Sequence, residues 1–320
     1  MKFTILIPTY NGSAHVEEAL LSAINQTRLA DAIIVSDDNS TDNTLEICSR
    51  YKDIVRICKN ENGPSGFVQG WNNAIKLVDD GYIAILHQDD LLAPTFLEEM
   101  ERAIEQNPDV RHFFAPCNYI DGNGSVKREP DYCDGTVRRY SGLEYADAYR
   151  SIGSPHIHRC PGVVTHKRIF DKCQYRKEAG HIADDDFFYR VGQYTDVVGI
   201  LKPLASYREH NKSETGNLGN IILVCRLAND YLFQVQQSKE NRCISMETNH
   251  YFAYWAESYT FQAFIYSLVN SDYYLQEMSL SNKRVLEQNG IQIPIKHQFI
   301  YSLSKIFGRK IVSLLLRVIL

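Results

Sequence analysis

The fold is decided by the opening stretch of the chain, FTILIPTYNGSAHVEEALLSAINQTRLADAIIVSDD (residues 3–38). Its first six residues are apolar or β-branched and end at Pro8, which is typical of a buried strand. Apolar residues then recur at helical spacing over residues 14–26, and residues 32–38 predict a second strand. This stretch therefore predicts two strands joined by a helix, the unit from which parallel sheets are built.

The same alternation continues to residue 107. Two more strands are predicted at 55–60 and 82–90, and helices at 40–51, 66–78 and 94–107. Ser40 or Thr41 is expected to cap the first of these helices. The order of elements predicts an α/β fold with a doubly wound, mainly parallel sheet flanked by helices.

After residue 110 the pattern loosens. Strand character is predicted near 111–120, 162–170 and 196–210, and helical character near 142–150 and 181–194. From residue 217 onward the pattern is helical and aromatic. We therefore predict a nucleotide-binding catalytic domain over residues 1–215 and a helical region over 216–320 that is associated with the acceptor or the membrane.

Composition excludes several classes of protein. The chain has 320 residues with 44% hydrophobic and 23% charged residues, which is ordinary globular usage, and its net charge of −5 gives no basic field for nucleic acid. None of the eight cysteines forms a C-x-x-C motif, so a zinc ribbon is not supported. With no signal-peptide pattern and no run of about 18 apolar residues, a cytoplasmic protein is expected.

Polar side chains follow three of the predicted strands. Ligands of open parallel sheets bind beyond the carboxyl ends of the strands, so these residues are candidates for a site. Each group alone is typical of a turn or a helix cap, but their joint placement favours a site. The three groups are Thr9, Tyr10 and Asn11; Ser36 to Ser40; and His87, Gln88, Asp89 and Asp90.

Two acidic clusters point to different chemistry. Asp89 and Asp90 follow an apolar strand, where carboxylates are costly unless a cation such as Mg²⁺ or Mn²⁺ compensates them. Asp184, Asp185 and Asp186 open a helix, so capping is one interpretation. Mutual repulsion would raise the pKa of one of these three, which is the property of a general base.

Five motifs in order resemble the signature of the family-two, GT-A-fold inverting glycosyltransferases. They are ILIPTYNG, SDDNSTDNT, HQDD, ADDDFFYR and YREHNKS, and the resemblance covers residues 2–215. It implies metal-dependent transfer of a sugar from a nucleotide diphosphate sugar, with a UDP-sugar favoured, to a saccharide or lipid-linked saccharide acceptor. It also implies a place in cell-surface polysaccharide or glycolipid assembly.

The resemblance assigns roles to residues. Thr9, Tyr10 and Asn11 would line the base and ribose, and Asp38 would contact one of them. Asn72 matches the family's Arg-Asn pair, with Trp71 in place of the arginine.

The metal and the base are assigned in the same way. Asp89 matches the last aspartate of the D-x-D motif and His210 a residue near the metal and diphosphate, while Asp184, six residues before Arg190, matches the catalytic base. His87 departs from the first aspartate of that motif, and it either ligates the metal, faces the ribose or packs. Its neighbours Gln88 and Asp90 are placed in the donor-binding set.

The reaction requires these groups to be separate. Charge on the leaving nucleoside diphosphate needs a cation, and the acceptor hydroxyl must lose a proton. One carboxylate opposite the leaving group implies direct displacement with inversion, whereas a glycosidase pair would favour hydrolysis.

Two other functions stay open. A sugar nucleotidyltransferase has a similar fold but usually a Gly-rich first loop, and TYNGSAHV has one glycine. A noncatalytic carbohydrate- or nucleotide-binding protein would not hydrolyse a donor. The pair His156 and His158 is interpreted as surface or acceptor-side residues rather than a zinc site.

The C-terminal tail is the last feature with a functional interpretation. IVSLLLRVIL (311–320) is too short to span a bilayer, and the basic residues near it are Lys305, Arg309, Lys310 and Arg317. The tail is expected either to lie in the interface on the inner face of the membrane or to dock on the catalytic domain.

Overall fold

The computed structural model describes residues 1–149, 157–210, 220–238 and 245–305. Contacts within these residues divide the chain into two compact units. The first, which we call the catalytic unit, comprises residues 1–177 and 184–210, and the second, the helical unit, comprises residues 178–183 and the described residues after 210. The predicted division at residue 215 stays a prediction.

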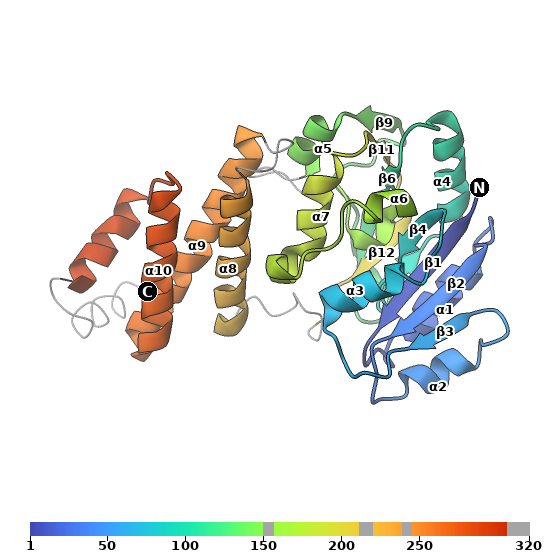
Figure 1. Cartoon of the computed structure of the whole chain (residues 1–320), viewed down its shortest axis with the longest axis horizontal. Helices are drawn as coiled ribbons and strands as arrows, with labels where there is room; N and C mark the ends of the chain where they lie inside the picture. The colour runs from blue at the N-terminus through green and yellow to red at the C-terminus, as the bar shows by residue number, and fades with distance from the viewer. Residues whose placement is uncertain (150–156, 211–219, 239–244, 306–320) are drawn as a thin grey trace. The chain divides into compact units, whose positions relative to one another are not determined.

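Within the described part of the chain, eight strands form the main sheet of the catalytic unit, in the order β3-β2-β1-β4-β10-β6-β11-β9 (Figure 1). The four strands at one side are parallel, β10 is antiparallel to both of its neighbours, and β9 is antiparallel to β11. The predicted mainly parallel sheet is thus confirmed. The strands are β1 (Phe3–Thr9), β2 (Ala32–Asp37), β3 (Arg56–Lys59), β4 (Tyr82–Ile85), β6 (His112–Phe114), β9 (Val137–Tyr140), β10 (Val163–His166) and β11 (Val197–Ile200).

A second sheet of the catalytic unit has the order β5-β12-β7-β8. Its strands are β5 (Leu91–Leu92), β12 (Ala205–Arg208), β7 (Cys117–Ile120) and β8 (Val126–Arg128). The strand region predicted at 196–210 is therefore divided between the two sheets. This division matters for the site, because β5 begins directly after Asp90 and pairs with β12.

Helices of the catalytic unit follow the predicted strands. They are α1 (Val16–Ile24), α2 (Thr44–Ser49), α3 (Phe67–Ile75), α4 (Phe96–Gln106), α5 (Gly142–Tyr149), α6 (Lys167–Phe170) and α7 (Ala183–Val191), with the 3₁₀ turns η1 (Cys160–Gly162) and η2 (Lys177–Ile182). The expectation that Ser40 or Thr41 caps α2 is wrong. The helix begins four residues after Ser40, and its N-cap Asn43 makes no side-chain cap hydrogen bond.

The core of the catalytic unit lies where β1 meets α1. Ile5 and Ile7 of β1 and Val16 and Leu20 of α1 are fully buried in one cluster. Each such side chain contributes about 1.5–3 kcal/mol when removed from water. Because this burial fixes β1, it also fixes the polar loop that follows the strand.

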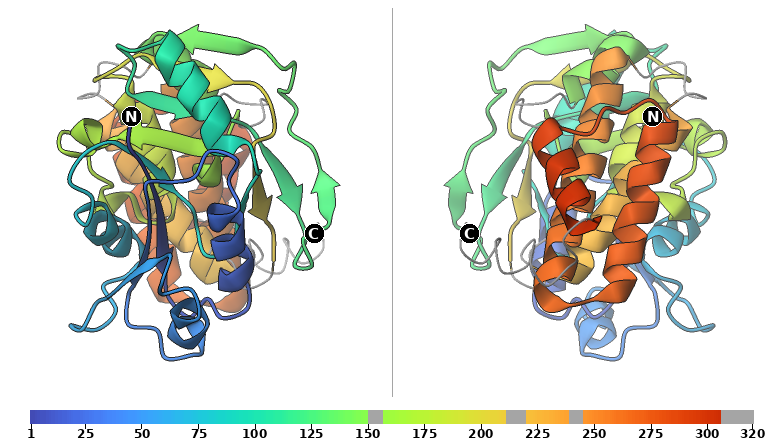
Figure 2. Two further views of the ribbon diagram at one scale, coloured as in Figure 1. Left: turned by 90° about the vertical axis from the view of Figure 1, so that its right-hand side faces the viewer. Right: turned by 90° about the vertical axis from the view of Figure 1, so that its left-hand side faces the viewer.

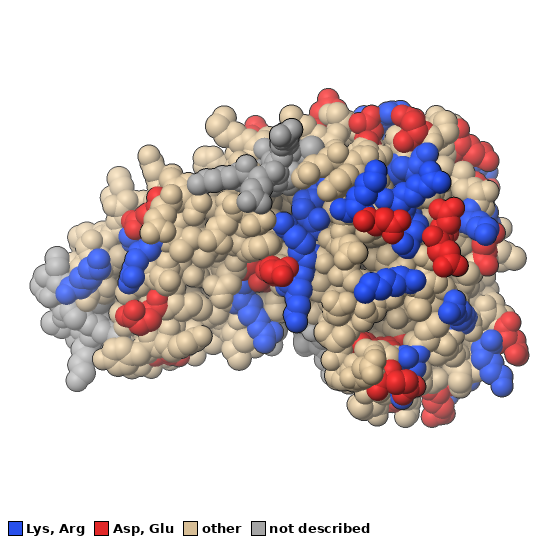
Figure 3. Space-filling view, in the orientation of Figure 1, with Lys and Arg blue, Asp and Glu red and all other residues tan. Residues whose placement is uncertain are grey.

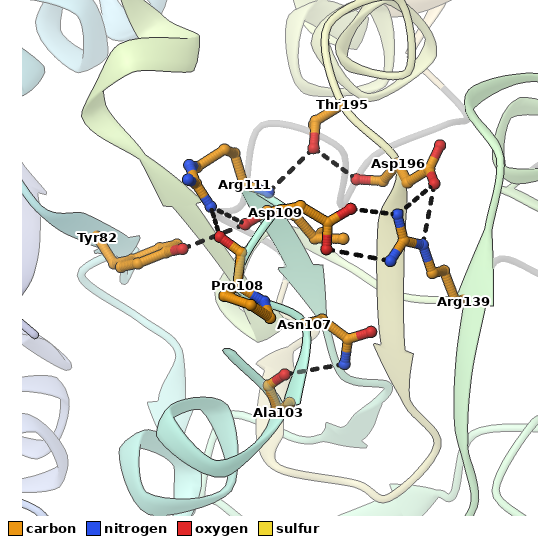
Figure 4. Close-up of polar contacts among 10 residues, drawn as sticks. Tyr82, Ala103, Asn107, Pro108, Asp109, Arg111, Arg139, Thr195 and Asp196 are labelled. Carbon is orange, nitrogen blue, oxygen red and sulfur yellow. Dashed lines mark hydrogen bonds and ion pairs between the residues drawn. The ribbon is translucent and has the colours of Figure 1, made fainter. Parts of the chain in front are cut away.

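The edge strand β9 is held by charge rather than by burial (Figure 4). The Arg139 guanidinium pairs with Asp109 and, at 2.7 Å, with Asp196. Beside this pair the Arg111 amide donates to Thr195 Oγ1 at 3.0 Å. On the face shown in Figure 3, acidic and basic side chains lie interspersed over the catalytic unit.

The helical unit contains α8 (Ile221–Gln237), α9 (Met246–Asn270) and α10 (Tyr273–Gln288), which pack side by side (Figure 2), and residues 295–305 are also helical. Each of the three begins with a side-chain cap, from Asn220, Ser245 and Asp272 respectively. The predicted helical and aromatic character is confirmed. Within the described residues, every helix falls short of the length and apolarity needed to cross a membrane.

Candidate functional site

The ends of β1, β2 and β4 are joined by hydrogen bonds. The Thr9 hydroxyl donates to Asp37 at 3.0 Å, which links β1 to β2. The Tyr10 amide donates to Gln88 Oε1 at 2.9 Å, and Gln88 Nε2 donates back to the Tyr10 carbonyl at 3.1 Å. The structure therefore brings these strand ends together at one edge of the sheet, as the sequence predicts. We call this edge, with the residues that directly follow β1, β2 and β4, the rim.

Asn11 holds the loop after β1 in a special conformation. Its φ of 49° lies in the left-handed region, which Asn tolerates better than most residues. Its amide donates to Ser40 Oγ at 2.9 Å, and its side-chain oxygen accepts from the Thr41 amide at 2.8 Å. Ser40 and Thr41 thus hold this loop instead of capping α2.

Asp38 organises the segment that precedes α3. Its carboxylate accepts from Asn60 Nδ2 at 2.8 Å, from the Ser65 amide at 2.7 Å and from the Gly66 amide at 3.1 Å. It is buried. Its contact with the base or ribose stays a prediction, and the observed bonds show that it shapes the loop beside the rim.

Asn72 connects α3 to the segment before α7. Its Nδ2 donates to the Tyr175 carbonyl at 2.8 Å, and its Oδ1 accepts from the Tyr175 amide at 3.2 Å. The preceding Trp71 stacks on His87, with ring centroids 5.1 Å apart. Burial lowers the pKa of His87, against the opposing effect of Asp89.

Asp89 and His210 meet at the rim. Asp89 Oδ2 and His210 Nε2 are 2.9 Å apart, and both side chains are partly exposed. Neighbouring ligands of an octahedral cation lie about 3 Å apart when each bond is about 2.1 Å. The pair therefore fits a divalent cation. His15, which sequence analysis did not select, lies beside it with its ring 5.3 Å from that of His210.

The metal site that Asp89 and His210 would form has few protein ligands. Among the described residues, no group of three or more His, Cys, Asp or Glu side chains is placed to hold a metal. Mg²⁺ sites commonly use one or two protein ligands together with substrate phosphates and water. A cation held by Asp89 and His210 would thus take its remaining ligands from water or from a bound phosphate group.

Asp90 lies behind the rim rather than on it. It is 1% exposed, and its Oδ1 accepts from the Arg208 amide at 2.8 Å. Burial has the largest effect on the pKa of this carboxyl and the negative charge of Asp89 the next largest, and both raise the pKa well above its usual value. Direct contact of Asp90 with the donor stays a prediction.

Arg208 is the residue that sequence analysis missed. Its side chain is fully buried, and Nε donates to the Asp89 carbonyl at 2.7 Å while Nη2 pairs with Glu18 at 2.7 Å. Nη1 donates to the carbonyls of Asp121 and Gly122. The signal was present in the YREH motif, from which only the histidine was selected.

The three carboxylates at the start of α7 have different surroundings. Asp186 is buried and paired with Arg176 and Arg190. Asp185 is buried and accepts from the Tyr149 hydroxyl at 2.6 Å. Asp184 alone among them is partly exposed.

The Cys160 thiol is influenced both by the acidic start of α7 and by the end of β4. Burial raises the pKa of its thiol, and the next largest effects come from the carboxylates of Asp184 and Asp90. Since both act on one buried thiol, α7 and the end of β4 face the same part of the catalytic unit.

His158 corrects a sequence-based interpretation. It is 2% exposed and its Nε2 lies 2.6 Å from the Tyr145 hydroxyl, so it is a core residue and not a surface one. Its partner in the motif, His156, lies outside the described residues.

An α/β sheet whose polar strand ends meet at one edge, with separate candidates for a metal ligand and a base, fits a glycosyltransferase of the GT-A type. Residues 4–172 match the sequence model of Glycosyl transferase family 2. The chain belongs to that family.

Relatives and solved structures agree with this assignment. A UDP-Glc:α-D-GlcNAc-diphosphoundecaprenol β-1,3-glucosyltransferase of Escherichia coli is 33% identical over 64% of this chain and 97% of its own length. An uncharacterized glycosyltransferase of Methanocaldococcus jannaschii is 27% identical over 58% of this chain, which spans only 63% of that relative.

The fold is shared with two solved structures. The structure of S. aureus TarS 1–349 with UDP-GlcNAc has a TM-score of 0.59 at 14% identity, covering 99% of this chain and 92% of that one. The mannosyltransferase PcManGT of Pyrobaculum calidifontis, with GDP-Man and Mn²⁺, has a TM-score of 0.55 at 15% identity, covering 98% and 83%.

Proposed function

We propose that this protein transfers a sugar from a nucleotide diphosphate sugar to an acceptor hydroxyl with inversion. The observation that carries the proposal is the contact between Asp89 and His210 at the rim. Hydrogen bonds of Thr9, Tyr10 and Gln88 join the strand ends there. Family membership and the nucleotide sugars named for the two solved structures support it.

Asp89 and His210 would hold a divalent cation, Mg²⁺ or Mn²⁺. When bound, the cation would stabilise charge on the leaving diphosphate. Mn²⁺ in the named mannosyltransferase structure supports this requirement. Asp184 would take the proton of the acceptor hydroxyl, because it is partly exposed whereas Asp185 and Asp186 are buried.

The acceptor that we propose is a saccharide linked to a lipid diphosphate, in polysaccharide or glycolipid assembly. This proposal rests on the name of the E. coli relative and on that of a Campylobacter jejuni β-1,3-glucosyltransferase, which also specifies a PP-undecaprenol substrate. A UDP-sugar is the favoured donor for the same reason. Peripheral contact with a membrane would bring the enzyme to such an acceptor.

The proposal is tested by incubating the protein with a panel of nucleotide sugars and measuring release of nucleoside diphosphate. We expect release with Mg²⁺ or Mn²⁺, little release in chelator, and loss of release in Asp89→Ala. Asp79→Ala is the control, because Asp79 is exposed and precedes β4, whereas Asp89 follows the other end of that strand. Full release in chelator would refute the metal assignment, and no release or binding with any donor would refute the function.

A further inference from the structure

The two positions at which this chain departs from the family signature lie in contact. Trp71 on α3 stands where the signature has arginine, and His87 after β4 stands where it has aspartate. Their rings are stacked, with centroids 5.1 Å apart and an interplanar angle of 16°. An aromatic contact therefore occupies the place of a cation and an anion.

Two more rings support this stack. Phe67 and Tyr175 meet Trp71 edge-on at 5.3 Å and 5.2 Å. Trp71 and His87 themselves are only partly buried, so part of the stack is open to a ligand. It is adjacent in sequence to Asn72 and two residues from Asp89.

Chemistry distinguishes the stack from the pair that it replaces. A guanidinium binds phosphate through two parallel hydrogen bonds, which an indole cannot do. Aromatic faces instead suit bases and the apolar faces of sugars. At residue 71 the indole therefore offers an attraction for the uncharged part of the donor and no bidentate hydrogen bonds to its diphosphate.

On the basis of the proposed function, we propose that Trp71 and His87 form one specificity-determining unit that contacts the nucleoside or sugar of the donor and leaves the diphosphate to the cation. The two residues are expected to act as a unit, because either single change destroys the stack of rings. His87→Asp alone also adds a third carboxylate beside Asp89 and Asp90, whereas the double variant adds a cation together with that carboxylate.

The first test is a double-mutant cycle in the full-length protein. Calorimetry with saturating Mg²⁺ gives the Kd of UDP or GDP, whichever the wild type binds more tightly, for Trp71→Arg, His87→Asp and the double variant. The double variant should lose less affinity than the product of the two single losses, by about threefold or more. Strictly multiplicative losses would overturn the proposal.

The second test separates a contact with the donor from a structural role. Trp71→Leu should weaken binding of the nucleotide by about tenfold, the usual worth of one stacked base, yet leave the Kd of inorganic diphosphate unchanged. Trp71→Phe, which keeps a ring, should lose less. An equal loss for nucleotide and diphosphate would mean that the stack only supports the fold.

A fluorescence measurement provides an independent check. Trp71 and Trp255 are the two tryptophans of the chain, so Trp255→Phe leaves Trp71 as the sole reporter. Its emission should change on addition of nucleotide and not of diphosphate, and an unchanged emission would count against contact. A wild type that binds neither UDP nor GDP would refute the proposed function itself, and this inference with it.

Discussion

At the scale of single residues, the acidic start of α7 shows how surroundings assign roles to identical side chains. Asp186 neutralises two arginines and Asp185 accepts a hydrogen bond from Tyr149, and both are buried, whereas Asp184 is partly exposed. We expect Asp184→Asn to lower turnover by about 10²–10⁴-fold, because positioned acid–base catalysis is worth that much. Nucleotide affinity, measured by calorimetry, should be unchanged.

The neighbouring variants are the controls for this prediction. Asp186→Asn should instead lower the urea concentration at which the protein unfolds, because it leaves Arg176 and Arg190 without their shared carboxylate. If Asp185→Asn or Asp186→Asn abolished turnover in a folded protein while Asp184→Asn retained it, the base would be misassigned.

Arg208 is the residue on which the geometry of the rim depends. It fixes the Asp89 carbonyl through Nε and reaches the β7–β8 loop through Nη1. Arg208→Lys keeps the charge but cannot make this set of directed bonds. We expect a loss of about 1–3 kcal/mol in the free energy of unfolding, because lysine leaves some of the carbonyl acceptors without a donor, together with weaker metal-supported binding of nucleotide.

Urea denaturation and calorimetry check the Arg208 prediction. Arg128→Lys serves as its control, because Arg128 is an exposed arginine whose replacement should change stability by about 0.5 kcal/mol or less. Equal unfolding midpoints for Arg208→Lys and the wild type would contradict the assignment.

At the scale of elements, Gly180 forms a kink inside η2, three residues before α7 begins. Its φ of 57° and ψ of −126° suit glycine, and a Cβ there would lie 2.1 Å from Asp230 Oδ1. The other oxygen of Asp230 accepts from the His181 amide at 2.9 Å. We expect Gly180→Ala to lower the free energy of unfolding by about 2–4 kcal/mol, since it adds backbone strain and displaces a buried carboxylate.

Circular dichroism during urea unfolding measures this effect. Gly290→Ala is the matched control, since Gly290 also has a positive φ of 81° but has open space where its Cβ would be. It should cost about 1 kcal/mol from strain alone. Similar losses for both variants would show that Asp230 contributes nothing at residue 180.

The elements of the first hundred residues could be predicted because local patterns specify them. The helix expected at 94–107 is observed as α4 (Phe96–Gln106), and the strand expected at 3–8 as β1 (Phe3–Thr9). The strand expected at 82–90 ends earlier, at Ile85, and is followed by a turn in which the Asp90 amide donates to the His87 carbonyl at 3.2 Å. The division of 196–210 between two sheets depends on pairing with β6 and β7, which no local pattern encodes.

The same distinction between local and distant contacts explains the site. The sequence was enough to predict that Thr9, Tyr10 and Gln88 meet at one rim, because residues that follow parallel strands lie at the same edge of the sheet. Whether a carboxylate lies on or behind the rim depends on distant partners. Asp90 is buried by β12, more than a hundred residues away in sequence, and Arg208 acts through contacts with three separate segments.

At the scale of the whole molecule, the candidate metal ligands, base and donor residues all belong to the catalytic unit. The residues just before the base, 178–183, group instead with the helical unit. Folding of the helical unit therefore bears on the backbone that leads into Asp184. The tail, residues 306–320, lies outside the described part of the chain, and its two interpretations remain to be separated by experiment.

Deletion of residues 304–320 distinguishes these interpretations. If the tail lies in a membrane interface, the intact protein should sediment with vesicles that contain anionic lipid, because each basic residue near such a surface contributes about 1 kcal/mol. The truncated protein should stay in solution, fold normally and bind nucleotide as before. Binding by the intact protein should weaken at high salt and be poor with neutral vesicles, since screening removes the charge attraction. An intact protein that ignores anionic vesicles, with a truncated form that unfolds or aggregates, would identify the tail as part of the fold and exclude membrane docking through it.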